Sequence, residues 1–311
     1  MTGRRFPAGL RSRDGWARWL EAQRSPFPHI HQIEPTNHCP YHCVMCPRSG
    51  RMTRPQGFMN PNLFTRLVDE IATYTPEVRD KEIELFHFGE SLLHPEIARL
   101  TALASERGLK AVLSVNPPHL KPRLIEPLLR AHPHRIILSM DGWDTESYSA
   151  IRGSAANFDT AVAAVEALHE VHARLSSTTD IVLRMIVMAG NRPHVEEVCE
   201  FWRSRGVMVE LRDFFPWTEP AMVPLGSFQR NPPFMPCPFP WRYLVVQWDG
   251  TVVACCRDYD AVNVLGNART QSLVEIWNGP AAAAFRDRHR CGAVGDNPLC
   301  APCDKIYYCE E

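Results

Sequence analysis

Along residues 29–215, short apolar runs alternate with longer stretches in which apolar residues return every three or four positions. Such a return is typical of an amphipathic helix, and residues 60–74 show it with Leu63, Leu67 and Ile71 on one face. The short runs predict strands at 29–36, 82–87, 110–115, 135–140, 180–188 and 207–212. Helices are predicted between them, at 60–74, 95–107, 121–131, 157–174 and 195–205.

Strands that alternate with helices in this way run parallel and are joined by crossover helices. About six such units fit before residue 215, which is too few for a complete eight-fold barrel. We therefore predict an α/β fold, a partial (β/α)6 TIM-like barrel over residues 29–215, with its chemistry at the C-terminal ends of the strands.

The pattern changes on both sides of this region. Residues 1–28 carry Arg and Pro and predict an irregular N-terminal arm, and residues 216–236 are rich in Pro and aromatics and predict a linker. Two apolar runs, 243–248 and 251–254, flank Asp249-Gly250, a turn dipeptide that predicts a β-hairpin. A short helix is predicted at 272–278, so residues 237–311 form a small C-terminal domain of hairpin plus helix.

Composition narrows the class of protein. Lys+Arg 34 against Asp+Glu 35 gives a net charge of −1, which argues against a general binder of nucleic acid. No apolar run reaches the roughly 18–20 residues of a membrane span. Residues 1–30 lack the apolar core of a signal peptide, so we expect a cytoplasmic protein without nucleic-acid or membrane partners.

Eleven cysteines are the unusual feature of this sequence. In a reducing compartment, clustered thiols more often bind metal or carry out redox chemistry than form structural disulfides. Cys39, Cys43 and Cys46 form a C-x3-C-x2-C set directly after a predicted strand. Three thiolates on one loop can each bind a different iron of a cubane cluster and leave the fourth iron open. A zinc site completed by a neighbouring histidine, or plain packing, remains an alternative from spacing alone.

The loop and the segments after it resemble the signature of the radical S-adenosylmethionine (SAM) superfamily. Phe88-Gly89-Glu90 is similar to the family's Gly-Gly-Glu motif, and Ser139-Met140-Asp141-Gly142 is similar to its Ser-x-Asp-Gly, with Ile151-Arg152-Gly153 following. The resemblance implies a [4Fe–4S] cluster whose open iron is chelated by SAM. One electron then cleaves SAM to a 5′-deoxyadenosyl radical, which abstracts hydrogen from substrate. The residues that the resemblance places against SAM are Met45, Gly89, Glu90, Ser114, Asn116, Ser139 and Arg184.

The C-terminal cysteines resemble those of the SPASM/twitch extensions of radical SAM enzymes. By this resemblance Cys237, Cys255, Cys300 and Cys303 ligate one auxiliary [4Fe–4S] cluster, which makes two clusters in all. A second auxiliary cluster would need cysteines beyond the end of this sequence, so we expect the one-cluster, twitch form. A four-cysteine zinc module is the alternative. Cys256, Cys291 and Cys309 are left over, and Cys199 reads as a packing residue.

The substrate and the reaction are expectations that rest on the resemblance. The paired Cys255-Cys256 and the layout of the chain resemble aminoglycoside-tailoring enzymes of the neomycin C epimerase type. We therefore expect an epimerase of an amino sugar in which the Cys256 thiol returns hydrogen to the opposite face of the ring. Substrate ammonium groups would pair with Asp141, Asp213 and Asp258, and flavodoxin or ferredoxin would supply electrons. A radical dehydrogenase of an aminocyclitol or sugar alcohol, a peptide-modifying SPASM enzyme and a zinc-bearing binding protein are the alternatives.

Overall fold

Parallel strands build the larger part of the structure, a computed structural model that describes residues 12–214, 217, 225–226 and 236–303. Six of them are β1 (His29–Ile33), β2 (Glu82–Glu84), β3 (Lys110–Val115), β4 (Arg135–Ser139), β5 (Asp180–Val187) and β6 (Met208–Asp213). They lie side by side in the order β6-β5-β4-β3-β2-β1, and each pairs in parallel with its neighbour. This arrangement confirms the predicted partial barrel.

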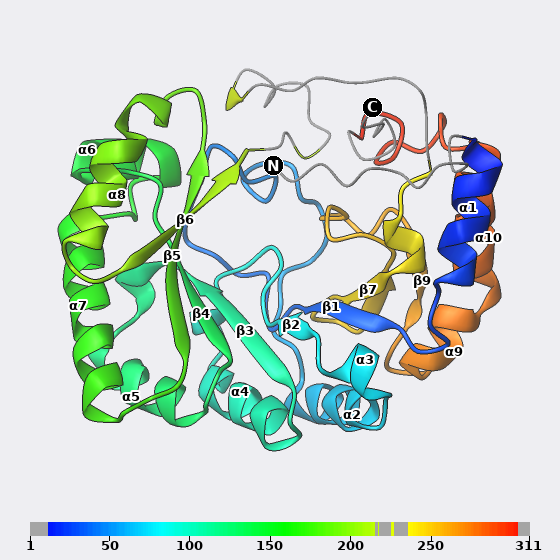
Figure 1. Cartoon of the computed structure of the whole chain (residues 1–311), viewed down its shortest axis with the longest axis horizontal. Helices are drawn as coiled ribbons and strands as arrows, with labels where there is room; N and C mark the ends of the chain where they lie inside the picture. Colours follow the sequence, from blue (N-terminus) through cyan, green and yellow to red (C-terminus); the bar gives the residue numbers. More distant parts are fainter. Residues whose placement is uncertain (1–11, 215–216, 218–224, 227–235, 304–311) are drawn as a thin grey trace.

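Helices cover the outer face of this sheet (Figure 1). The main ones are α2 (Pro61–Ala72), α4 (Ile97–Glu106), α5 (Pro122–Arg130), α7 (Phe158–Arg174) and α8 (Val195–Arg203). Leu113 of β3 and Leu138 of β4 are completely buried in the core that these helices share with the strands. The opposite, concave face carries polar side chains such as Glu84, Ser114 and Ser139, which are only partly buried. The concave face is therefore where a polar ligand can bind.

The C-terminal region continues the same sheet. Its strand β7 (Tyr243–Val246) pairs in parallel with β1, β8 (Thr251–Val253) pairs antiparallel with β7, and β9 (Val264–Asn267) pairs antiparallel with β8, which gives nine strands among the described residues. The predicted hairpin is confirmed, and Gly250 takes the positive φ of 88° that its turn needs. Helix α9 (Leu273–Asn278) matches the predicted short helix.

Several elements were not predicted from the sequence. They are β9, α3 (Pro76–Arg79), α6 (Thr145–Arg152), α10 (Pro280–Cys291) and, within the segment expected to be irregular, α1 (Arg13–Ala22). The expectation for that segment was wrong because Trp16 and Leu20 lie on one face of α1 and pack against Trp241. Helix α1 runs alongside α10 (Figure 1), so the beginning of the described chain is fixed to the C-terminal region. Within the described ranges, no helix combines the length and apolarity that a membrane crossing requires.

Candidate active site

The three N-terminal cysteines lie together on the loop that follows β1. Burial raises the pKa of Cys39 to about 11 and that of Cys43 to about 12, and it also raises the pKa of Cys46. Thiols with such pKa values stay protonated unless a metal replaces the proton. The Arg48 guanidinium fixes the loop by donating to the carbonyl oxygens of Cys39 and Tyr41, at 2.6 and 2.7 Å. The loop can therefore present three thiolates to a metal cluster.

A second segment, Ile151-Arg152-Gly153, supports this loop from behind. The backbone N–H groups of His42 and Val44 donate to the carbonyl oxygens of Arg152 and Ile151, at 3.1 and 2.9 Å. Gly153 has a φ of 92°, and a Cβ at this position would lie 3.0 Å from the backbone nitrogen of His42. Glycine is needed here for both reasons. The segment is thus part of the framework that shapes the cysteine loop.

Glu90 lies beyond the end of β2 and is completely buried. One carboxylate oxygen accepts from the backbone N–H and the side-chain amide of Asn116, at 2.9 and 2.5 Å, and the other accepts from the Leu92 N–H at 3.2 Å. Burial raises the pKa of Glu90 to about 6, although these hydrogen bonds favour the ionised form. Its backbone N–H donates to the His38 carbonyl oxygen at 2.8 Å, so Glu90 is tied directly to the cysteine loop. A carboxylate in this position can bind an ammonium group.

Gly89 allows the close approach of two loops. A Cβ on this residue would lie 2.0 Å from the carbonyl oxygen of Thr36, a backbone atom that cannot move aside. Only glycine therefore lets the end of β2 pass the segment that leads into the cysteine loop.

Arg152 connects Glu90 to the far side of the barrel. Its guanidinium donates to the Asn116 Oδ1 and to the Asp141 carboxylate, and the Nε–Oδ2 distance to Asp141 is 2.7 Å. The other oxygen of Asp141 accepts from the Ile186 N–H at 2.7 Å. A continuous line of hydrogen bonds therefore crosses the ends of β2, β3, β4 and β5, next to the cysteine loop.

The C-terminal cysteines form the second site. Cys237, Cys255, Cys300 and Cys303 line one small cavity, together with Phe239, Pro240, Ala254, Arg257, Phe285, His289 and Leu299. Burial raises the pKa of Cys237 well above its usual range and that of Cys300 to about 12. Arg257 donates to the Cys303 sulfur at 3.4 Å, which favours a thiolate there.

The sulfurs surround this cavity instead of converging on one point. Among the described residues, no group of three His, Cys, Asp or Glu side chains is arranged to hold a single metal ion. The donor set, four thiols that do not converge on a single ion, fits a soft group that prefers thiolates and offers more than one metal position.

The model of the radical SAM superfamily matches residues 33–201, more than half of the chain and the whole region that carries the first cysteine loop. The chain belongs to the radical SAM superfamily. A second family, the SPASM iron–sulfur cluster-binding domain, matches residues 237–304, which contain the four cysteines of the second cavity. The family and the domain imply a [4Fe–4S] cluster with SAM and an auxiliary iron–sulfur cluster, and the two cysteine sites fit these groups.

Relatives of this radical SAM chain differ in how much of it they match. The 2-deoxy-scyllo-inosamine dehydrogenase of Niallia circulans, which is SAM-dependent, is 20% identical over 277 residues, 88% of this chain and 92% of that protein. The AdoMet-dependent heme synthase of Methanosarcina barkeri is 27% identical over 143 residues, and the match spans 46% of this chain and 40% of that protein.

Solved structures of radical SAM proteins share the fold. BtrN in complex with AdoMet and 2-DOIA has a TM-score of 0.57 at 17% identity, and the match covers 90% of this chain and 96% of that one. The Streptococcus suis SuiB bound to its precursor peptide SuiA has a TM-score of 0.66 at 13% identity, with 92% and 74% of the two chains covered. Identities this low establish the fold alone.

The remaining side chains expected to contact SAM come from the cysteine loop and from strands β3, β4 and β5. Ser114 and Ser139 lie on neighbouring strands with their hydroxyl oxygens 3.2 Å apart, and Met45 is buried against Met188. Arg184, the expected partner of the SAM carboxylate, pairs instead with Glu210 on β6 at 2.9 Å. Its guanidinium therefore already has an anionic partner, which a SAM carboxylate would have to share.

Cys256 is not one of the residues that line the four-cysteine cavity. Cys255 and Cys256 follow β8 outside the strand; Cys255 lines the cavity, whereas Cys256 packs against the cluster of Tyr243, Val245 and Val253. The two thiols interact directly, and the Tyr243 hydroxyl donates to the Cys256 sulfur at 3.3 Å. His31 also interacts with this sulfur. Cys256 is thus near the auxiliary site and also faces His31 of β1.

The three aspartates expected to bind substrate have different surroundings. Asp141 and Asp258 are completely buried, Asp141 against Arg152 and Ile186, and Asp258 against the backbone N–H groups of Val262 and Asn263, at 2.8 and 2.7 Å. Their carboxylates therefore hold the protein together, which corrects the expectation that they face a substrate. Asp213 is exposed at the end of β6, so its binding of a substrate ammonium group stays a prediction.

Two of the remaining cysteines lie on different helices. Cys291 is exposed at the end of α10, Cys199 is half-buried on α8, and Cys309 lies outside the described residues.

Sequence reasoning missed a polar group on the concave face. The Gln32 side-chain amide donates to a Glu84 carboxylate oxygen at 2.7 Å, and His31 Nε2 lies 3.7 Å from the same oxygen. A register shift between Ile30 and Gln32 makes this grouping, because a bulge turns a side chain that would otherwise face away. The adjacent polar letters at 31 and 32, which break the alternation of polar and apolar residues that begins at His29, were the available signal.

Proposed function

We propose that this radical SAM protein is a dehydrogenase that oxidises a secondary hydroxyl group of an aminocyclitol or a similar amino sugar to a ketone. The observation that carries the proposal is the cavity lined by four cysteine thiols, because a cluster with four protein ligands has no open iron and is suited to accept an electron. The match to 2-deoxy-scyllo-inosamine dehydrogenase over 92% of that protein supports the same reaction.

Cys39, Cys43 and Cys46 hold the SAM-binding cluster in this proposal, and Cys237, Cys255, Cys300 and Cys303 hold the auxiliary cluster. Glu90 binds the SAM ammonium, because it is a buried carboxylate fixed to the cysteine loop. Asn116 and Arg152 orient this carboxylate through the hydrogen bonds described above. Met45, Gly89, Ser114, Ser139 and Arg184 complete the wall against which SAM lies.

The reaction removes one hydrogen atom, one proton and one electron from the carbinol. When bound, SAM and its cluster supply the 5′-deoxyadenosyl radical that takes the hydrogen atom, and the auxiliary cluster supplies the acceptor for the electron. Glu84 is the proposed proton acceptor, since burial raises its pKa and His31 lies 3.7 Å away to pass the proton on. Asp213 is left to contact a substrate ammonium at the mouth of the barrel.

Epimerisation, the reaction first expected from the sequence, is the second candidate. One observation favours it: the Cys256 sulfur, which is not among the four proposed ligands, lies beside His31 and Tyr243 of β1 and β7. A thiol there can return a hydrogen atom to a substrate radical. The full-length relative is a dehydrogenase, and dehydrogenation therefore takes first place.

Mass spectrometry of aminocyclitols and aminoglycosides after anaerobic incubation with SAM and reductant in deuterated water separates the two reactions. Dehydrogenation gives a product 2 mass units lighter than the substrate, one per 5′-deoxyadenosine, and Cys256→Ala still makes it. Epimerisation gives a product 1 unit heavier through the exchangeable thiol, and Cys256→Ala makes 5′-deoxyadenosine but little product. The proposal is overturned if 5′-deoxyadenosine forms and the substrate returns heavier by 1 unit.

A further inference from the structure

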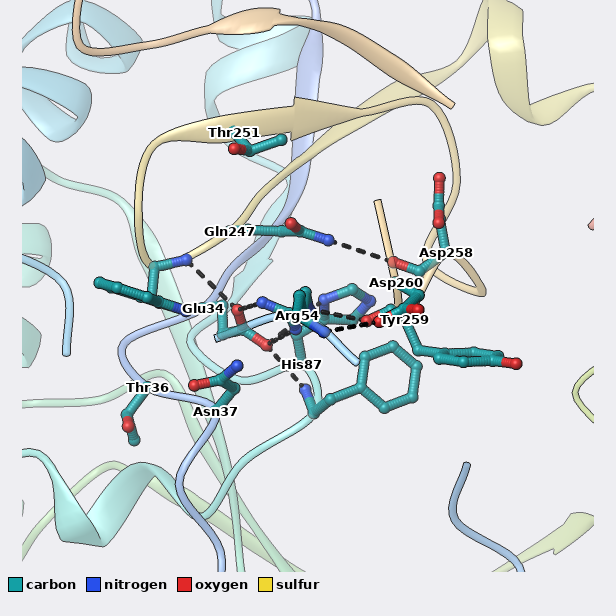
Figure 2. A network of polar contacts seen from close by, with 12 residues as sticks. Glu34, Thr36, Asn37, Arg54, His87, Gln247, Thr251, Asp258, Tyr259 and Asp260 are labelled. Atoms are coloured by element: carbon teal, nitrogen blue, oxygen red, sulfur yellow. Dashed lines mark hydrogen bonds and ion pairs between the residues drawn. The ribbon is translucent and has the colours of Figure 1, made fainter. Parts of the chain in front are cut away.

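A charged group buried between the two cysteine sites takes no part in the proposed reaction. Glu34 follows β1 with 0% of its side chain exposed, and the Arg54 guanidinium, 8% exposed, binds both of its oxygens at 2.6 and 2.7 Å. Figure 2 shows this pair at the centre of a network of polar contacts between separate segments of the chain. Arg54 lies eight residues beyond Cys46, on the segment that leaves the first cysteine loop.

Arg54 also binds the turn that follows Cys255 and Cys256. Its Nε donates to the Tyr259 carbonyl oxygen at 2.7 Å. Asp260 of the same turn bonds back to the segment that carries Arg54. Its carboxylate accepts from the Thr53 N–H and hydroxyl, both at 2.6 Å, and from the Arg54 N–H at 2.9 Å. Thr53 and Arg54, which lie beyond the first cysteine loop, therefore make five hydrogen bonds of 2.6–2.9 Å to Glu34, Tyr259 and Asp260, when the two bonds to Glu34 are counted as one.

His87 binds the same turn from the barrel side. Its Nε2 donates to the carbonyl oxygen of Cys256 at 2.9 Å, and its Nδ1 lies 3.7 Å from a Glu34 oxygen. The His87 side chain is 1% exposed, so it is held by this packing. Glu34 further accepts from the backbone N–H groups of Phe88 and Trp248, each at 3.2 Å. The end of β1, the end of β2 and the turn after β7 thus meet at one carboxylate.

A buried ion pair is a poor way to gain stability, because the cost of removing two charges from water offsets most of their attraction. Apolar side chains of similar volume would hold these segments together as firmly. A bidentate Arg–carboxylate pair differs from apolar packing in that it fixes relative position and angle. The value of this group therefore lies in the geometry that it imposes on the segments it joins.

We propose that Glu34, Arg54, His87 and Asp260 form a clasp that positions the Cys255–Asp260 turn against the segment leaving the first cysteine loop. The clasp sets the separation of the two iron–sulfur sites and the direction in which the Cys256 thiol faces the concave side of the barrel. These are positioning residues, and none of them touches the substrate. The inference rests on the proposed function only in that both sites act on one substrate.

Asp260 is the residue to change, because it is partly exposed and its loss leaves no buried charge unpaired. Asp260→Ala removes three hydrogen bonds to Thr53 and Arg54, whereas Asp260→Asn keeps an oxygen that can accept from their backbone N–H groups. Asp249→Ala is the matched control, since Asp249 accepts the Thr251 N–H at 2.9 Å within its own turn. All four proteins are compared as anaerobic holoenzymes with measured iron contents.

Two readouts distinguish positioning from folding. In Asp260→Ala we expect full iron content and 5′-deoxyadenosine formation close to wild type, but about tenfold less product per 5′-deoxyadenosine, because small displacements at a reacting centre are costly. The rate at which iodoacetamide alkylates Cys256, followed by peptide mapping without any substrate, should rise about threefold or more as the turn loosens. Asp260→Asn and Asp249→Ala should match wild type in both readouts.

An unchanged Cys256 alkylation rate in Asp260→Ala would overturn the clasp, as would an equal loss of product and 5′-deoxyadenosine. The alkylation comparison needs no turnover. It therefore decides this inference even where wild-type enzyme makes no ketone, a result that counts against the proposed function alone.

Discussion

Replacing Glu90 by glutamine separates the charge of this residue from its shape. The pKa of Glu90 rises from an ordinary 4.5 to about 6 in the SAM-free protein, because burial disfavours the ionised carboxylate. At 1.36 kcal/mol per unit, ionised Glu90 costs the fold about 2 kcal/mol at pH 8. Because the pKa of this acid is raised on folding, the protonated form of Glu90 carries no such cost. The corresponding folding stability is fully present below pH 4.5 and is lost as the pH rises through 6.

Glutamine removes that cost but cannot accept all three hydrogen bonds. Its amide carbonyl can keep both bonds from Asn116, while its NH₂ group faces the Leu92 N–H, a mismatch of about 1 kcal/mol. Glu90→Gln should therefore be as stable as wild type at pH 8, or more stable by about 1 kcal/mol. It should bind SAM about 10- to 100-fold more weakly, since a hydrogen bond to a charged group contributes about 1.5–3 kcal/mol.

Equilibrium dialysis of SAM against reconstituted protein between pH 5.5 and 8.5, done anaerobically, measures both effects. Wild-type affinity should fall as the pH drops below about 6, whereas Glu90→Gln should show no such fall. Glu84→Gln is the matched control, a partly buried glutamate on β2 that makes no contact with Asn116 and should bind SAM normally. Wild-type affinity in Glu90→Gln at pH 8, or an equal loss in Glu84→Gln, would refute the role given to this carboxylate.

Three further substitutions test separate parts of the structure. Cys303→Ala should lower the iron content from about eight to about four per chain and abolish the product while 5′-deoxyadenosine still forms; unchanged iron would contradict the auxiliary-site assignment. Gly89→Ala should abolish SAM binding in dialysis, because its Cβ would lie 2.0 Å from the Thr36 carbonyl oxygen; normal binding would show that the two loops can separate. Glu34→Gln leaves the Arg54 charge buried and should lower the free energy of unfolding by about 3–5 kcal/mol in denaturant titration, and a loss below about 1 kcal/mol would show that water reaches the pair.

Local patterns predicted the elements whose apolar residues cluster or recur within one segment. The strands of the barrel and helix α2 were found because apolar letters alternate or recur within each segment, and α2 also begins with an Asn60 cap and Pro61. Helix α1 was missed because its short apolar face is covered by Trp241, far along the chain, and strand β9 because none of its residues is fully buried. The pairing of β7 with β1 has no local signal either, since the two strands are more than two hundred residues apart.

In the candidate site too, features with a local sequence signal were predicted, and features that depend on distant segments were not. The cysteines and Gly89-Glu90 could be found because their residue types are rare and their spacing is fixed by short loops. Asp141 was expected to face a substrate, but its carboxylate binds Arg152, and this pairing depends on how α6 returns to the end of β4. The clasp at Glu34 could not be predicted, because its members come from segments that meet only in the folded chain.

Low-temperature EPR of the reduced, reconstituted protein tests the central claim, that two iron–sulfur clusters are present and only the one at Cys39, Cys43 and Cys46 binds SAM. The account predicts two overlapping signals, of which one changes when SAM is added, and a Cys46→Ala protein that keeps only the signal that SAM leaves unchanged. A single signal, or a wild-type spectrum that SAM does not alter, would contradict it.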